Sequence, residues 1–124
     1  MTPRRFLRGV LVPVALALLA GCASVPSRSI TDIRDIEGKW QGTISVGLGP
    51  PQLYYLTVNP DATIVTTWGP NWQWGTVTLS GGQARFELSH LTSGTLQYFD
   101  GPDGRAITMN PDFGGWYVYV TPLE

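Results

Sequence analysis

Cysteine and histidine are almost absent from this chain of 124 residues, which has only Cys22 and His90. A single cysteine cannot form an intrachain disulfide, so the fold must be held together by its core. A zinc site needs three or four well-spaced Cys, His or carboxylate ligands, and the sequence offers no such set. Asp100 and Asp103 are typical of turn chemistry rather than of a calcium loop. We therefore expect no disulfide, no metal and no cofactor.

Catalytic signatures are missing as well. The sequence has no Gly-x-Ser-x-Gly elbow. His90 follows Ser89, so it could act as a base, but a lone loop histidine is typical of a surface or capping residue. Nothing in the pattern brings together two carboxylates for glycoside hydrolysis, for which the candidates are Asp61, Glu87 and Asp100. The glycines lead into expected strands, whereas a phosphate loop needs a following helix. We therefore expect a non-enzymatic protein.

No apolar run is long enough to span a bilayer, which takes about 20 residues in a helix. The longest run, Gly9–Ala20, has twelve residues and follows Arg4, Arg5 and Arg8. A basic start followed by a short apolar stretch is typical of a secretory signal. Its end, Leu19-Ala20-Gly21-Cys22, resembles the lipobox of bacterial lipoproteins.

The lipobox resemblance implies how the N-terminus is processed. Residues 1–21 would be a lipoprotein signal peptide, and Cys22 would carry a diacylglyceryl group and an acylated amino group. Two or more acyl chains hold a protein firmly to a membrane, whereas one chain anchors it only marginally. Ala23 stands where an Asp would favour the inner membrane, so the resemblance implies the outer membrane with the domain facing the periplasm. The alternative is a secreted protein with a free thiol.

Positive charge is scarce once the signal is removed. The signal contains three of the eight Lys and Arg residues, which leaves five against nine Asp and Glu, a net charge of −4. The remaining cations are scattered along the chain: Arg28, Arg34, Lys39, Arg85 and Arg105. Because phosphate contacts need clustered Lys and Arg, we do not expect nucleic acid as a partner.

The rest of the chain is expected to be a lipidated tether over residues 22–28 and one domain over residues 29–124. Ser29–Glu37 has an isoleucine at every third position, and Ser29 or Thr31 would cap one or two helical turns. From Lys39 onwards, turn signals recur every eight to twelve residues and apolar side chains alternate with polar ones. The expected strands are Lys39–Gly47, Gln52–Asn59, Thr63–Trp68, Trp72–Leu79, Gln83–Leu88, Gly94–Phe99, Arg105–Asn110 and Trp116–Thr121. Their short connections leave no room for crossover helices, so the sequence predicts an all-β protein, a small antiparallel eight-stranded meander barrel.

Gly38-x-Trp40 opens the first expected strand directly after the helical turn. This layout resembles the calycin barrels, which include the lipocalins, the avidins and small lipoprotein barrels. The resemblance implies a lipocalin/avidin-like barrel, and in lipocalins a cation from the last strand usually lies over the tryptophan. Here Trp116–Thr121 contains no cation. No residue of the avidin ligand site can be carried over to this chain.

Three of the five tryptophans fall within seven residues, at Trp68, Trp72 and Trp74. Trp72 and Trp74 should share one side of a strand, and Trp68 could reach them across the intervening turn. One interpretation is that these side chains pack the core and rim of a small barrel. The other is that they form a contact surface at the barrel mouth, together with Tyr54 and Tyr98.

Two functions fit these expectations. The first is a membrane-anchored, non-enzymatic lipoprotein that binds a small apolar or aromatic ligand, or a cell-envelope component, at the barrel rim. The second is a protein-interaction module, such as an inhibitor of an envelope hydrolase (a lysozyme or a protease) or an accessory subunit of an envelope complex, with loop 47–51 or 101–104 as its contact. An eight-stranded barrel either is filled by side chains or holds one small ligand. The residues expected to face inward are mostly bulky and predict a filled barrel: Trp40, Ile44, Val46, Phe86, Leu88, Trp116, Val118 and Val120. A closed interior would favour the second function.

Overall fold

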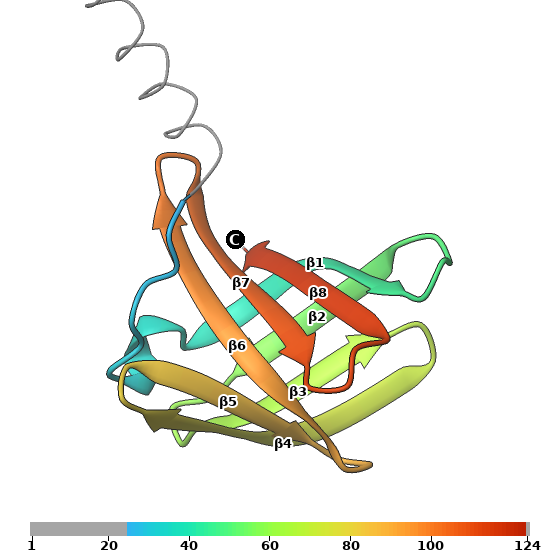
Figure 1. The fold of residues 1–124 in the computed structure, drawn as a ribbon, viewed down its shortest axis with the longest axis horizontal. Helices are drawn as coiled ribbons and strands as arrows, with labels where there is room; N and C mark the ends of the chain where they lie inside the picture. The colour runs from blue at the N-terminus through green and yellow to red at the C-terminus, as the bar shows by residue number, and fades with distance from the viewer. Residues whose placement is uncertain (1–24, 124) are drawn as a thin grey trace, which may run out of the picture.

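The computed structural model describes residues 25–123, which form strands joined by short turns. The strands are β1 (Gly38–Val46), β2 (Gln52–Val58), β3 (Thr63–Trp68), β4 (Asn71–Ser80), β5 (Gln83–Leu88), β6 (Thr92–Gly101), β7 (Gly104–Pro111) and β8 (Trp116–Pro122). Each strand pairs antiparallel with the next, and β8 pairs with β1 to close the barrel (Figure 1). The predicted all-β meander barrel is confirmed. The expected signal peptide and Cys22 lie outside the described residues.

The strands β4, β6 and β7 are longer than the sequence predicts, because the hairpin turns that join them to their neighbours take up only two residues on at least one side. Only Gly81 and Gly82 separate β4 from β5, and both have positive φ angles, 60° and 80°. Two consecutive residues with positive φ form the tight hairpin turn that matches the twist of paired strands. The hairpin of β6 and β7 likewise turns over only Pro102 and Asp103.

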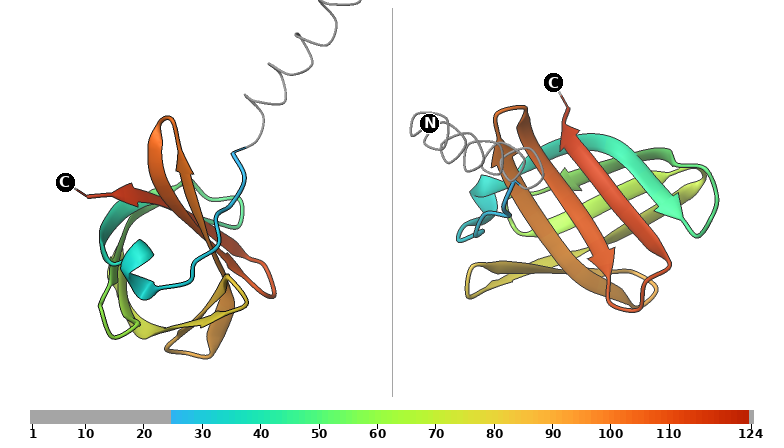
Figure 2. Two further views of the ribbon diagram at one scale, coloured as in Figure 1. Left: turned by 90° about the vertical axis from the view of Figure 1, so that its left-hand side faces the viewer. Right: turned by 45° about the horizontal axis from the view of Figure 1, so that its top comes forward.

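The predicted short helical turn before β1 is confirmed as a single 3₁₀ turn, η1 (Ile33–Asp35). Its N-cap is Asp32 rather than Ser29 or Thr31, because Asp32 Oδ1 accepts a hydrogen bond of 3.0 Å from the Arg34 amide. Ile30 and Ile36 are buried, and the segment covers the end of the barrel at which β1 begins (Figure 2). We call this the closed end; its strand connections are residues 59–62, 81–82 and 102–103.

Large side chains fill the interior of the barrel. Trp40, Tyr54, Phe86, Ile107 and Met109 are all at most 1% exposed. Six of the eight residues expected to face inward are buried, namely Trp40, Ile44, Phe86, Leu88, Val118 and Val120. The other two, Val46 and Trp116, face inward but remain partly exposed at the opposite end of the barrel. We call this the open end; its strand connections are residues 47–51, 69–70, 89–91 and 112–115.

Glycines permit close contact between neighbouring strands at several points of the barrel wall, including Gly75 and Gly42. A Cβ atom on Gly75 of β4 would collide with the backbone carbonyl of Glu87 on β5. A Cβ atom on Gly42 of β1 would collide with the backbone carbonyl of Tyr119 on β8. Because glycine within a strand commonly marks a sharp bend or a close backbone approach, these two positions help the sheet to close.

Candidate functional site

Trp40 holds the segment that covers the closed end against the barrel. Its indole Nε1 donates a buried hydrogen bond of 2.9 Å to the Ile36 carbonyl, which ties the segment after η1 to β1. The Arg105 guanidinium lies 5.1 Å from the centre of the Trp40 ring, within cation–π range. The cation that lies over Trp40 therefore comes from β7 and not from the last strand, β8. These contacts stabilise the barrel and leave Trp40, which is 1% exposed, unavailable to a ligand.

A small hollow of about 90 Å³ lies at the open end. Trp68, Trp116, Gln73 and Tyr54 are among its lining residues. The Tyr54 side chain is 1% exposed, and its hydroxyl donates only a weak bond to Met109 Sδ at 3.8 Å. Burial raises the pKa of Tyr54 to about 12, with a smaller opposite effect from the Thr66 hydroxyl. Because one water takes up about 30 Å³ of the liquid, this hollow has room for only a few waters.

Trp72 and Trp74 lie on the outside of the barrel rather than at its mouth. They share the outward face of β4 and are 58% and 56% exposed. Their neighbours on β3 are Thr67, paired with Trp72, and Val65, paired with Trp74. The expectation that Trp68 meets them across the turn is wrong, because Trp68 pairs with Asn71 and faces inward. We call the two exposed indoles the Trp72–Trp74 surface.

Tyr98, the fifth residue of the expected contact surface, is also remote from the Trp72–Trp74 surface. It is 8% exposed, and its carbonyl accepts a hydrogen bond from the Arg28 amide at 2.6 Å. This bridge fixes the incoming chain beside β6 near the closed end. The structure thus divides the five candidates among the open-end hollow (Tyr54 and Trp68), the outer face of β4 and the barrel interior.

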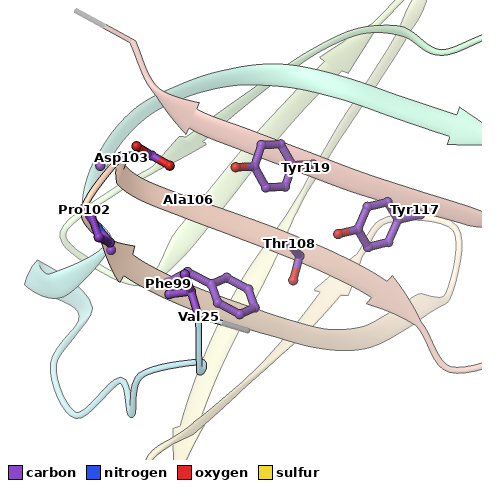
Figure 3. A pocket seen from close by; sticks show the side chains of 10 residues that line it. Val25, Phe99, Pro102, Asp103, Ala106, Thr108, Tyr117 and Tyr119 are labelled. Atoms are coloured by element: carbon purple, nitrogen blue, oxygen red, sulfur yellow. The ribbon is translucent and has the colours of Figure 1, made fainter. Parts of the chain in front are cut away.

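A further surface, which the sequence did not predict, covers the outward faces of β6, β7, β8, β1 and β2. We call it the outer wall. It contains a groove of about 260 Å³ lined by residues that include Val25, Phe99, Tyr117 and Tyr119 (Figure 3). Val25 of the expected tether packs here, and a Cβ atom added to Gly101 would lie 3.2 Å from Val25 Cγ1. The sequence feature that indicates this surface is the segment 116–121, which carries apolar side chains on both faces of its strand.

The groups that could support catalysis are dispersed. Asp61 lies in the turn at the closed end, where its Oδ1 accepts a bond of 3.1 Å from the Thr63 amide. Glu87 lies near the other end of the barrel, close to the C-terminus of β5. His90 is in an exposed turn with a φ angle of 71°. Within residues 25–123, no three His, Cys, Asp or Glu side chains are grouped as metal ligands.

One ion pair lies on the outside of the barrel between β5 and the loop after β7. Arg85 Nη1 donates to Asp112 Oδ1 at 2.8 Å, and Ser93 Oγ donates to Asp112 Oδ2 at 3.2 Å. The hydrogen bonds from Arg85 lower the pKa of the Asp112 carboxyl. This exposed pair is typical of a surface contact that holds a loop in place.

No family model, curated protein or solved structure matches this chain. In the described part of the chain, no helix combines the length and the apolar character needed to cross a membrane.

Proposed function

We propose that this protein is a lipid-anchored, non-enzymatic interaction module of the cell envelope, whose Trp72–Trp74 surface binds a partner protein. Two half-exposed indoles on neighbouring outward positions of one strand carry the proposal. Tryptophan is enriched among the residues that dominate binding energy at protein interfaces, because it brings a large apolar area and one hydrogen-bond donor. The two side chains are about 7 Å apart along the strand, a spacing that one contact patch can cover.

The filled interior favours a protein partner over a small ligand. Ligand pockets usually enclose about 300–1,000 Å³ and bury most of the ligand. The open-end hollow is about 90 Å³, and neither Trp72 nor Trp74 lines it. Two exposed indoles on an outward sheet face suit a broad contact better than the enclosure of a small molecule.

The position of the tether orients the Trp72–Trp74 surface. Cys22, the proposed lipidation site, is three residues before Val25, and three residues extend at most about 11 Å. Val25 packs on the hairpin of β6 and β7, so the anchoring membrane lies close to that side of the barrel. The groove that holds Val25 extends to Tyr117 and Tyr119 of β8, and β8 is diametrically opposite β4 in the closed ring of strands. The Trp72–Trp74 surface therefore faces away from the membrane, into the periplasm if the anchor is in the outer membrane.

The same geometry favours an accessory subunit over an inhibitor that inserts a loop. Loop 101–104 is beside the tether, where the membrane restricts access to it. Loop 47–51 is at the open end and joins β1 to β2, and strand β3 separates it from the outward face of β4. Neither loop adjoins the two indoles. The proposed partner is an envelope protein that binds the two indoles through an apolar patch of its own. It would do so next to the mildly acidic surface of this protein.

The test is co-purification of the lipidated protein from detergent-solubilised envelopes, followed by affinity measurement with the purified partner. The double variant Trp72→Ala/Trp74→Ala should bind the partner at least about tenfold more weakly, since interface tryptophans cost roughly 2 kcal/mol or more on truncation. Thr76→Ala/Thr78→Ala, on the same exposed face, is the matched control and should bind normally. Equal binding by both variants would refute the proposal. Quenching of tryptophan emission by envelope glycans or lipids, abolished in the Trp72→Ala/Trp74→Ala variant, would instead support the small-ligand function.

A further inference from the structure

The exposed apolar side chains of the barrel are concentrated on one side. Twelve large apolar residues of the described chain are at least 39% exposed. Eight of them belong to the outer wall, to the loops that join its strands or to the segments that flank it: Val25, Leu48, Leu53, Tyr55, Phe113, Tyr117, Tyr119 and Leu123. Leu48 and Phe113, at the tips of the loops after β1 and β7, are fully exposed. Such a one-sided apolar surface marks an interaction site.

The outer wall also lacks charge. Its outward positions are Ser93, Thr95, Gln97 and Phe99 on β6, Ala106, Thr108 and Asn110 on β7, Tyr117, Tyr119 and Thr121 on β8, Gln41, Thr43 and Ser45 on β1, and Leu53, Tyr55 and Thr57 on β2. None of these is Lys, Arg, His, Asp or Glu. Charged side chains lie at its borders: Lys39 and Asp103 towards the closed end, and the Arg85–Asp112 pair, which contacts Ser93 and Thr95, towards β5. The outward face of β5, by contrast, carries Arg85 and Glu87.

We propose that the outer wall lies flat on the phospholipid bilayer that holds the Cys22 anchor. This inference rests on the lipid anchoring of the proposed function. Val25 is already seated on the wall, and the lipid would be attached three residues away, so the bilayer surface is within about 11 Å of Val25. Some face of the barrel must therefore meet the lipid headgroups.

The two faces within reach of the bilayer differ in chemistry. The closed end carries ionised groups, including Asp32, Arg34 and Glu37, whose transfer out of water is costly. The outer wall offers hydroxyls, amides and tyrosines, and tyrosine is enriched where protein meets the membrane–water interface. The exposed loop tips Leu48 and Phe113 would add apolar contact with the acyl region. The barrel thus rests on its wall, and the Trp72–Trp74 surface on the opposite side remains free.

The test uses the full-length, lipidated protein in vesicles of phosphatidylethanolamine and phosphatidylglycerol. Because acylation blocks Cys22, a spin label can be attached to one introduced cysteine at a time. Thr43→Cys places it on the wall, between Leu53 and Tyr119 in the strand register. Thr76→Cys, an equally exposed threonine on the outward face of β4, is the matched control. Collisions of each label with oxygen, which partitions into lipid, and with a water-soluble nickel chelate are then measured.

We expect the Thr43 label to lose several-fold of its nickel access on the vesicle, and the Thr76 label to keep its own. The variant Tyr117→Ser/Tyr119→Ser should remain on the vesicle through its lipid but restore nickel access at Thr43. Equal nickel access at both labels would overturn the inference. Spin–spin broadening between Thr43 labels would also overturn it, since a second copy would then cover the wall. Failure of the protein to float with vesicles would overturn the lipid anchor itself, and with it this inference, and is distinguished by mass spectrometry of Cys22.

Discussion

Replacing Trp40 by Phe should destabilise the barrel substantially without unfolding it. The substitution removes the Nε1–H that bonds the Ile36 carbonyl at 2.9 Å in a buried setting. Leaving a buried carbonyl without a partner costs about 1–3 kcal/mol. The smaller ring also weakens the contact with Arg105, whose guanidinium lies 5.1 Å from the indole centre, an interaction worth about 0.5–2 kcal/mol. The expected loss is therefore about 2–4 kcal/mol, out of a total near 5–15 kcal/mol for a domain of this size.

Urea unfolding followed by circular dichroism measures this loss without relying on the emission of the replaced residue. With an m-value of about 2 kcal/mol/M, the midpoint should fall by about 1–2 M at unchanged slope. Trp116→Phe is the control, because Trp116 is only partly buried at the open end, and it should cost less than about 1 kcal/mol. A loss for Trp40→Phe no larger than that for Trp116→Phe would refute the claim that Trp40 holds the segment that covers the closed end against the barrel.

Three further predictions concern the anchor, the barrel wall and the core. Cys22→Ser should abolish labelling by radioactive fatty acid and release the domain from membranes, whereas labelling that persists would contradict the lipobox interpretation. Gly75→Ala should lower the free energy of unfolding by about 1–3 kcal/mol or more, because the new Cβ meets the Glu87 carbonyl, and an unchanged urea midpoint would count against the close strand contact. Above pH 10 the unfolded state gains stability by ionising Tyr54, whose pKa is raised from 10.0 to about 12 in the fold. The stability that the buried, protonated Tyr54 contributes is fully present below pH 10. Between pH 10 and 12 the free energy of unfolding then falls by about 1.4 kcal/mol per pH unit because of this residue. Tyr54→Phe should remove that share of the alkaline slope in urea titrations, and an identical slope in the variant would exclude the assignment.

The barrel could be predicted from sequence because its signals are local. Turn residues such as Gly81 and Gly82 act over two or three positions, and alternation within a strand reveals which side chains face the core. The inward positions of Trp40, Phe86 and Val118 followed from this alternation. Strand count and order then followed from connections too short for crossovers.

The arrangement of the aromatic residues could not be predicted, because it depends on register. Trp68 and Trp72 are four residues apart, but the tight turn pairs Trp68 with Asn71, so the two indoles lie on opposite faces of the sheet. The contact between Trp40 and Arg105 could not be predicted for a similar reason. Arg105 reaches the indole from β7, and no spacing in the sequence links positions 40 and 105. The outer wall collects residues from five strands, which only barrel closure brings side by side.

Photo-crosslinking in living cells tests directly whether a partner protein contacts the Trp72–Trp74 surface. A benzoylphenylalanine at position 67 would replace Thr67, which is the strand neighbour of Trp72 on the outward face of β3. We expect a discrete protein adduct at this position, lost in the Trp72→Ala/Trp74→Ala background, and none from the same probe at Ser45 on the outer wall. The absence of an adduct at position 67, or an adduct that is unaffected by loss of both tryptophans, would contradict the proposal that the Trp72–Trp74 surface binds a partner protein.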